Sequence, residues 1–141
     1  MIFFLDASAL AKRYIVEPGS SRVRQLFRRN ADIAVSRVSE VEVTSALVRR
    51  LKKRDLDAET VEQHLESLSE DLACCDVVEI RKPVISGARE LVRKYALRAY
   101  DGVQLSSALR IKARSALTFI CADGELADAA EAERLRVERL G

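Results

Sequence analysis

Residues 2–14, IFFLDASALAKRY, pass from a short apolar run through one acidic residue into a helical pattern. Residues 2–5 have the length and apolar character of a buried strand, and a helix is expected over residues 7–14. Asp6 stands between the two, where a carboxylate can accept a hydrogen bond from a free N–H group of the helix. The stretch therefore predicts a strand followed directly by a helix, the unit from which α/β folds are built.

The same alternation continues along the chain. It predicts further strands at residues 32–36, 75–80, 116–122 and 136–140, and helices at residues 20–29, 40–54, 57–73, 83–95, 101–113 and 125–133. Strands that alternate with helices favour a central, mostly parallel sheet of four to five strands, covered by helices. No linker, repeat or break in composition interrupts the pattern. We therefore interpret residues 1–141 as a single α/β domain.

Composition and charge exclude several classes of protein. Hydrophobic residues make up 48% of the chain and the net charge is only +2, which is ordinary for a globular domain. No apolar run approaches the roughly 18 residues of a membrane helix, and no basic leader is visible at the N-terminus, so we expect a soluble cytoplasmic protein. Cys74, Cys75 and Cys121 lack zinc-binding spacing, and a single histidine, His64, excludes mechanisms that need two imidazoles.

Acidic residues recur where strands end and helices begin. Asp6 follows the first predicted strand, Glu42 lies early in the helix after the second, and Asp123 follows the buried strand 116–122. Asp101 opens the helix that leads into that strand. Because the carboxyl ends of parallel strands share one edge of a sheet, and ligands bind there, we expect these four side chains to converge.

Helix capping is the alternative interpretation of each acid. Asp6, Asp101 and Asp123 are all good N-cap residues, and Ser39 with Glu42 fits a capping box. Capping alone does not require acids at every position, however, since serine, threonine or asparagine would cap as well. Converging carboxylates repel one another unless a cation lies among them, and oxygen-only clusters suit Mg²⁺ or Mn²⁺. The pattern therefore favours a divalent-metal site that acts on phosphate groups.

Four stretches of the sequence resemble the successive motif blocks of a known family. They are FFLDASALAKRYIVEPGS (3–20), VSEVEVTSALVRR (38–50), LRAYDGVQLSSAL (97–109) and FICADGELADAAEAERLRV (119–137). In order and spacing they are similar to the blocks of PIN domains of the VapC type, the ribonuclease toxins of type II toxin–antitoxin pairs. The resemblance extends from about residue 2 to residue 139. It implies a three-layer α/β/α sandwich and an Mg²⁺- or Mn²⁺-dependent endoribonuclease that hydrolyses RNA phosphodiester bonds.

The resemblance also assigns roles to individual residues. The metal-binding acids of the family fall on Asp6, Glu42, Asp101 and Asp123, and the hydroxyl residue that helps to hold a water or a phosphate oxygen falls on Ser8. A homodimer is implied, together with inhibition by a cognate antitoxin whose tail lies across the active-site groove. Cationic side chains on the rim, of which we select Arg37 and Arg49, would hold the RNA backbone.

Some alternatives remain open from the sequence. Glu40 competes with Glu42, which we prefer because position 46, one helical turn further on, is alanine and offers no ion pair. Asp128 is a possible extra acid, although its position suggests a surface helix. The whole domain could also be a non-catalytic RNA- or protein-binding module. A phosphatase of the haloacid-dehalogenase type is disfavoured because Ser8 stands where that chemistry needs a second aspartate.

Overall fold

The computed structural model describes all 141 residues and contains one sheet of five parallel strands in the order β3-β2-β1-β4-β5. The central strand, β1, places Phe4 between Ala34 and Phe119 of its two neighbours. Edge strand β3 is shorter than predicted because only three of its residues pair with β2. The predicted parallel α/β architecture is thus confirmed, with these strands: β1 (Ile2–Leu5), β2 (Asp32–Ser36), β3 (Asp76–Val78), β4 (Leu117–Cys121) and β5 (Arg136–Arg139).

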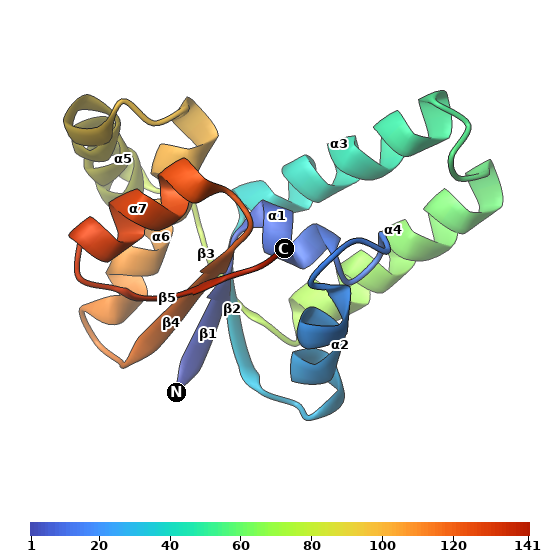
Figure 1. Cartoon of the computed structure of the whole chain (residues 1–141), viewed down its shortest axis with the longest axis horizontal. Coiled ribbons are helices and arrows are strands. Elements are labelled where there is room, and N and C mark those ends of the chain that lie inside the picture. Colours follow the sequence, from blue (N-terminus) through green and yellow to red (C-terminus); the bar gives the residue numbers. More distant parts are fainter.

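Seven helices cover the two faces of the sheet: α1 (Ala7–Ala11), α2 (Ser20–Arg28), α3 (Val38–Lys52), α4 (Ala58–Ala73), α5 (Lys82–Tyr95), α6 (Ala99–Lys112) and α7 (Gly124–Ala132). Helices α1–α4 lie on one face and α5–α7 on the other, and the α3–α4 pair projects from the body (Figure 1). Because side chains alternate along a strand, Leu5 packs beneath the first group and Phe4 beneath the second. The result is a three-layer sandwich with one core on each side of the sheet.

Helix α6 is buried on nearly every side, and this burial positions the acid in its first turn. Its residues pack against the sheet, α5 and the start of α3. Helix α5 comes so close at Gly102 that a Cβ there would lie 2.6 Å from Cγ2 of Val92. The close approach fixes the start of α6, and Asp101 with it. No helix of the protein is both long enough and apolar enough to cross a membrane.

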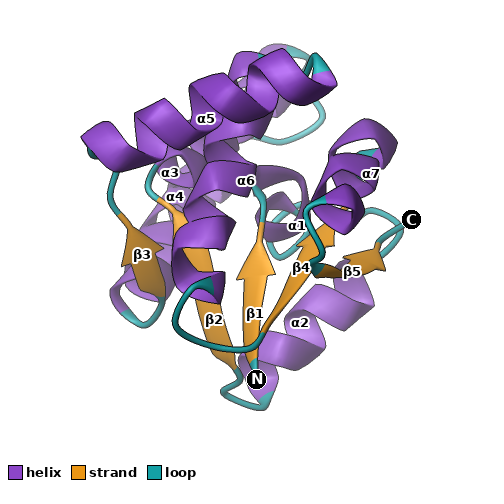
Figure 2. Cartoon of the chain, turned by 90° about the vertical axis from the view of Figure 1, so that its left-hand side faces the viewer, coloured by secondary structure: helices purple, strands orange, loops and turns teal.

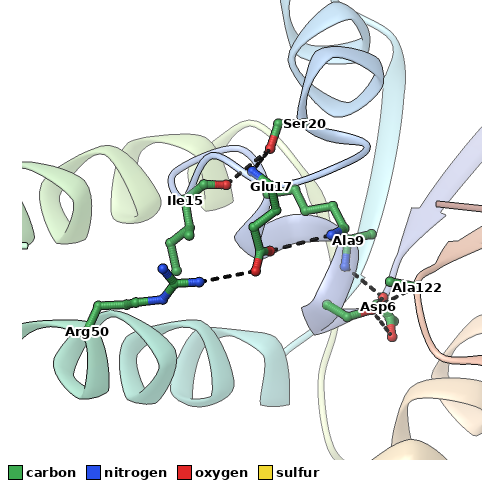
Figure 3. A network of polar contacts seen from close by, with 9 residues as sticks. Asp6, Ala9, Ile15, Glu17, Ser20, Arg50 and Ala122 are labelled. Atoms are coloured by element: carbon green, nitrogen blue, oxygen red, sulfur yellow. Dashed lines mark hydrogen bonds and ion pairs between the residues drawn. The ribbon is translucent and has the colours of Figure 1, made fainter. Parts of the chain in front are cut away.

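Helix α1 ends at Ala11, three residues earlier than predicted, and the chain turns back through a polar network (Figure 3). Glu17 accepts from Lys12 at 3.4 Å and from Arg50 of α3 at 3.3 Å. The hydroxyl of Ser20 closes the turn, accepting from the Glu17 N–H and donating to the Ile15 carbonyl. These contacts anchor α1 against α3 and so support the strand–helix junction at Asp6.

Candidate active site at the carboxyl edge of the sheet

Asp6 lies at the junction of β1 and α1, at the edge toward which all the strands point (Figure 2). Its side chain is only 3% exposed and caps α1 by accepting from the Ala9 N–H at 2.9 Å. The pKa of Asp6 is raised from 3.8 to about 7, mainly by burial and also by the nearby charges of Asp101 and Glu42, while the hydrogen bonds from Ser8 and Ala9 oppose the shift. The predicted capping role is confirmed, yet a cap on the surface would not carry this electrostatic cost.

Ser8 connects two of the chain segments that meet at this edge. Its hydroxyl lies 2.7 Å and 2.9 Å from the two carboxylate oxygens of Asp6, to which it donates. The same oxygen accepts from the Ala122 N–H at 3.1 Å, in the loop after β4; Figure 3 shows Ala122 beside Asp6. Ser8 therefore fixes the Asp6 carboxylate relative to the loop that carries Asp123.

Glu42 is half-buried on α3 and is held from across the site by Gln104 of α6. The Gln104 amide nitrogen donates to Glu42 Oε1 at 2.9 Å and to the Ser39 hydroxyl at 2.8 Å. Gln104 is 1% exposed, and its amide oxygen is buried without a hydrogen-bond partner. Burial is the main reason that the pKa of Glu42 is raised, and the charge of Asp101 adds to it. Sequence reasoning missed this role of Gln104.

Asp101 and Asp123 share one cationic partner, Arg98. Its Nη2 donates to Asp123 Oδ2 at 2.9 Å, and its Nε lies 3.6 Å from Asp101 Oδ2. The other oxygen of Asp123 caps α7 by accepting from the Leu126 N–H at 3.1 Å. Burial and the charge of Asp123 raise the pKa of Asp101, while Arg98 opposes that shift. Sequence reasoning also missed Arg98, although its spacing to Asp101 offered a signal.

Two of the predicted caps are wrong. Asp101 lies within the first turn of α6, whose N-cap is Arg98, because the helix begins two residues earlier than predicted. Ser39 does not cap α3, since that helix begins at Val38, and the Ser39 hydroxyl instead accepts from Gln104. Neither Asp101 nor Glu42 is therefore explained as a helix cap; Asp101 lies in the first turn of α6 beside Arg98, and Glu42 is held by Gln104.

The competing acids lie elsewhere. Glu40 is exposed and pairs with Arg37 at 2.9 Å, and Asp128 of α7 pairs with Arg139 at 2.7 Å. Arg37 also pairs with Glu79 at 2.7 Å, so its charge is largely engaged, whereas Arg49 is exposed and forms no ion pair. His64 lies half-buried on α4, beside the ring of Tyr14 and away from the four acids.

The four acids lie at the same edge of the sheet, but their side chains do not form a complete metal-coordination site. No group of three aspartate, glutamate, cysteine or histidine side chains is close enough to hold a metal ion in this arrangement. Burial nevertheless raises the pKa of Asp6, Glu42 and Asp101, and charge repulsion among the acids adds to each shift. Their oxygens are the ligands that Mg²⁺ and Mn²⁺ prefer, so the donor set fits such an ion. A shared metal ion stays a prediction.

One wide hollow of the molecule lies away from these acids. It has a volume of about 630 Å³ and lies at β3, between the start of α5 and the end of α6. Its lining includes Arg81, Arg110 and Arg114 but none of the four acids. This hollow is therefore separate from the candidate site, which is recognised by its carboxylates.

Replacing Gln104 by leucine should uncouple Glu42 from α6. We expect the RNA cleavage that the resemblance implies to fall about 10-fold to 100-fold, the usual effect of losing the partner that orients a functional carboxylate. The matched control is Ser106→Ala, which removes a buried hydrogen bond of the same helix, to the Val84 carbonyl at 2.7 Å. Both variants should lose on the order of 1–3 kcal/mol of folding free energy in urea titrations. Equal activity in the two variants would exclude a positioning role for Gln104.

Comparison with known proteins identifies the family. The PIN domain family model matches residues 3–132. Ribonuclease VapC49 of Mycobacterium tuberculosis H37Rv is 32% identical over 111 residues, which cover 78% of this chain and 76% of that protein. The structure of FitAcB from Neisseria gonorrhoeae matches with a TM-score of 0.70 at 20% identity, over 97% of this chain and 96% of that one. A chain in a toxin–antitoxin complex from Klebsiella pneumoniae matches with a TM-score of 0.61 at 16% identity, over 85% of each chain. The predicted resemblance is confirmed, and the chain belongs to the PIN domain family.

Proposed function

We propose that this protein is an Mg²⁺- or Mn²⁺-dependent endoribonuclease and the toxin of a toxin–antitoxin pair. The observation that carries the proposal is the Asp6 carboxylate, which is buried at the sheet edge and subject to the charges of Asp101 and Glu42. A carboxylate whose pKa is raised to about 7 at the ligand-binding edge of a sheet is typical of functional sites. Membership of the PIN family and similarity to a protein named a ribonuclease support the same assignment.

The four acids would have different roles in binding the metal ion. Asp6, Asp101 and Asp123 would be direct ligands, and Glu42 would bind either directly or through a water molecule. The ion would supply a Lewis acid that lowers the pKa of a water molecule and offsets the charge that grows on the phosphate. Ser8 keeps Asp6 oriented. The pKa values of Asp6 and Asp101 are raised by burial and, in addition, by repulsion between the acids, and an ion would relieve that repulsion.

RNA and protein partners follow from the same assignment. The exposed and unpaired Arg49 is the better of the two predicted backbone contacts, since Arg37 is engaged by Glu79 and Glu40. We propose a cognate antitoxin, which the matching fold in a toxin–antitoxin complex supports, and a homodimer, which rests on the family resemblance alone. The antitoxin should co-purify with this chain and silence its nuclease activity, and light scattering should give a dimer mass. If the product of the neighbouring gene neither binds this chain nor inhibits its nuclease activity, that product is not its antitoxin.

The other functional classes explain fewer of the observations. A non-catalytic binding module would not require four acids at one edge, with the pKa values of three of them raised. An aspartyl-phosphate phosphatase would need an accessible nucleophile at Asp6, whereas both oxygens of that carboxylate lie within hydrogen-bond distance of Ser8. Hydrolysis of RNA by metal-activated water is the function that uses all four acids.

Metal-dependent cleavage of RNA tests the proposal. Protein stripped with EDTA should leave a structured RNA substrate intact, and added Mn²⁺ or Mg²⁺ should restore cleavage. The Asp101→Asn variant should remain inactive at every metal concentration, because it lacks one carboxylate of the proposed site. Cleavage by the wild-type protein that continues in excess EDTA, or full activity of Asp101→Asn, would contradict the proposal.

A further inference from the structure

We propose that Arg98 is a built-in counterion that competes with the divalent cation for Asp101 and Asp123. The inference rests on the proposed function, since it assigns a metal ion to these two acids. It adds a role that the four acids alone do not predict: the chain supplies its own positive charge to the site. Arg98 would thereby set the metal concentration at which the enzyme becomes active.

The contacts place the Arg98 guanidinium between the two carboxylates. It reaches Oδ2 of Asp123 at 2.9 Å and Oδ2 of Asp101 at 3.6 Å. Oδ1 of Asp123 accepts from the Leu126 N–H, and Oδ2, which faces away from that cap, accepts from Arg98. A divalent ion held by Asp101 and Asp123 would therefore compete with the guanidinium for the oxygens that Arg98 contacts.

Arg98 is the only cation that pairs with any of the four acids. Asp6 is contacted by the neutral Ser8 hydroxyl and a backbone N–H, and Glu42 by the neutral Gln104 amide. Arg98 is thus the one positive side chain that offsets the repulsion between Asp101 and Asp123. In the absence of metal, this side chain stabilises the acidic edge.

The exposure of the three side chains allows an exchange. The Arg98 side chain is 79% exposed, whereas those of Asp101 and Asp123 are 20% and 25% exposed. Arg98 therefore approaches from the solvent and can withdraw without disturbing the core. An ion pair of this kind is weak enough for a divalent ion to replace, yet it still lowers the apparent metal affinity.

The test compares two variants that lose the same kind of contact. Arg98→Gln removes the guanidinium from the acidic edge. Arg139→Gln removes a guanidinium that bridges Asp128 at 2.7 Å and Glu131 at 3.0 Å, away from the site. Isothermal titration with Mn²⁺ should give about fivefold tighter binding for Arg98→Gln, the factor expected for about 1 kcal/mol of surface ion pairing. Arg139→Gln should bind Mn²⁺ as the wild type does.

Thermal melting supplies a second readout that does not depend on activity. Without metal, Arg98→Gln should melt at a lower temperature than the wild type. Saturating Mn²⁺ should raise the melting temperature of Arg98→Gln by more than it raises that of the wild type. If the wild type binds Mn²⁺ and Arg98→Gln binds it equally well or more weakly, the role proposed for Arg98 is wrong, but the metal site remains. Failure of both proteins to bind Mn²⁺ would overturn the metal site, and the role of Arg98 with it.

Discussion

Replacement of Asp6 by asparagine is expected to lower RNA cleavage by at least about 100-fold. The variant should also lose the rise in melting temperature that Mn²⁺ or Mg²⁺ confers on the wild type by mass action. Asp6 has the most buried of the four acidic side chains, and its orientation is set by Ser8 and the Ala9 N–H. An asparagine keeps an acceptor oxygen for the Ser8 hydroxyl and the Ala9 N–H, so the expected loss arises mainly from the missing charge.

Asp128→Asn is the matched control for this experiment. Asp128 is an aspartate of the neighbouring helix α7, but its side chain is 75% exposed and pairs with Arg139. Its variant should cleave RNA and respond to Mn²⁺ as the wild type does. If Asp6→Asn retained both properties, Asp6 would be a structural cap only, and the proposed site would lose its central member.

The stability of the metal-free protein should fall as the pH rises from about 4 to about 8. Burial raises the pKa of Asp6 from 3.8 to about 7 in the folded state. Between these values the folded protein keeps a proton that the unfolded chain has lost, so the stabilisation present at low pH disappears as the pH passes about 7. The expected loss from this group is on the order of 4 kcal/mol. Glu42 and Asp101, whose pKa values are also raised by burial, contribute with the same sign.

Urea titrations in EDTA, repeated across this pH range, measure the effect. The profile of Asp6→Asn should be flatter, and the variant should be the more stable protein at pH 8, because an amide carries no charge into the buried site. Exposed acids elsewhere contribute equally to both proteins and cancel in the difference. Parallel profiles for the two proteins would show that Asp6 ionises in the folded state as easily as in the unfolded chain.

The sequence supports the fold prediction because local pattern and packing agree along most of the chain. In the central strand, Phe4 and Leu5 point to opposite cores, as a strand buried on both faces requires. Strand order was not predictable in the same way, since β1 pairs with β2 and β4 through contacts that no local pattern encodes. The early end of α1 has the same origin: the turn after it is held by Ser20 and Glu17, which are beyond the helix.

Local sequence patterns predict only part of the candidate site. Asp6 and Asp123 were predictable as caps because each accepts from an N–H three residues ahead. The hydrogen bond between Gln104 and Glu42 joins residues 62 positions apart, and only the packing of α6 against α3 brings them together. Arg98 illustrates the opposite case, because its three-residue spacing to Asp101 was visible, whereas its stronger contact with Asp123 depends on the loop after β4.

The chemistry of the cut ends is the most direct test of the central claim, that the acidic edge hydrolyses RNA with water. The substrate is an oligoribonucleotide with a single 2′-deoxy substitution at the scissile position, which removes the internal nucleophile and leaves the protein untouched. If water attacks the phosphorus and the 3′-oxygen leaves, cleavage should continue with Mn²⁺ and yield 5′-phosphate and 3′-hydroxyl ends by mass spectrometry. Loss of cleavage on this substrate, with 2′,3′-cyclic phosphate ends on the unmodified RNA, would contradict the account.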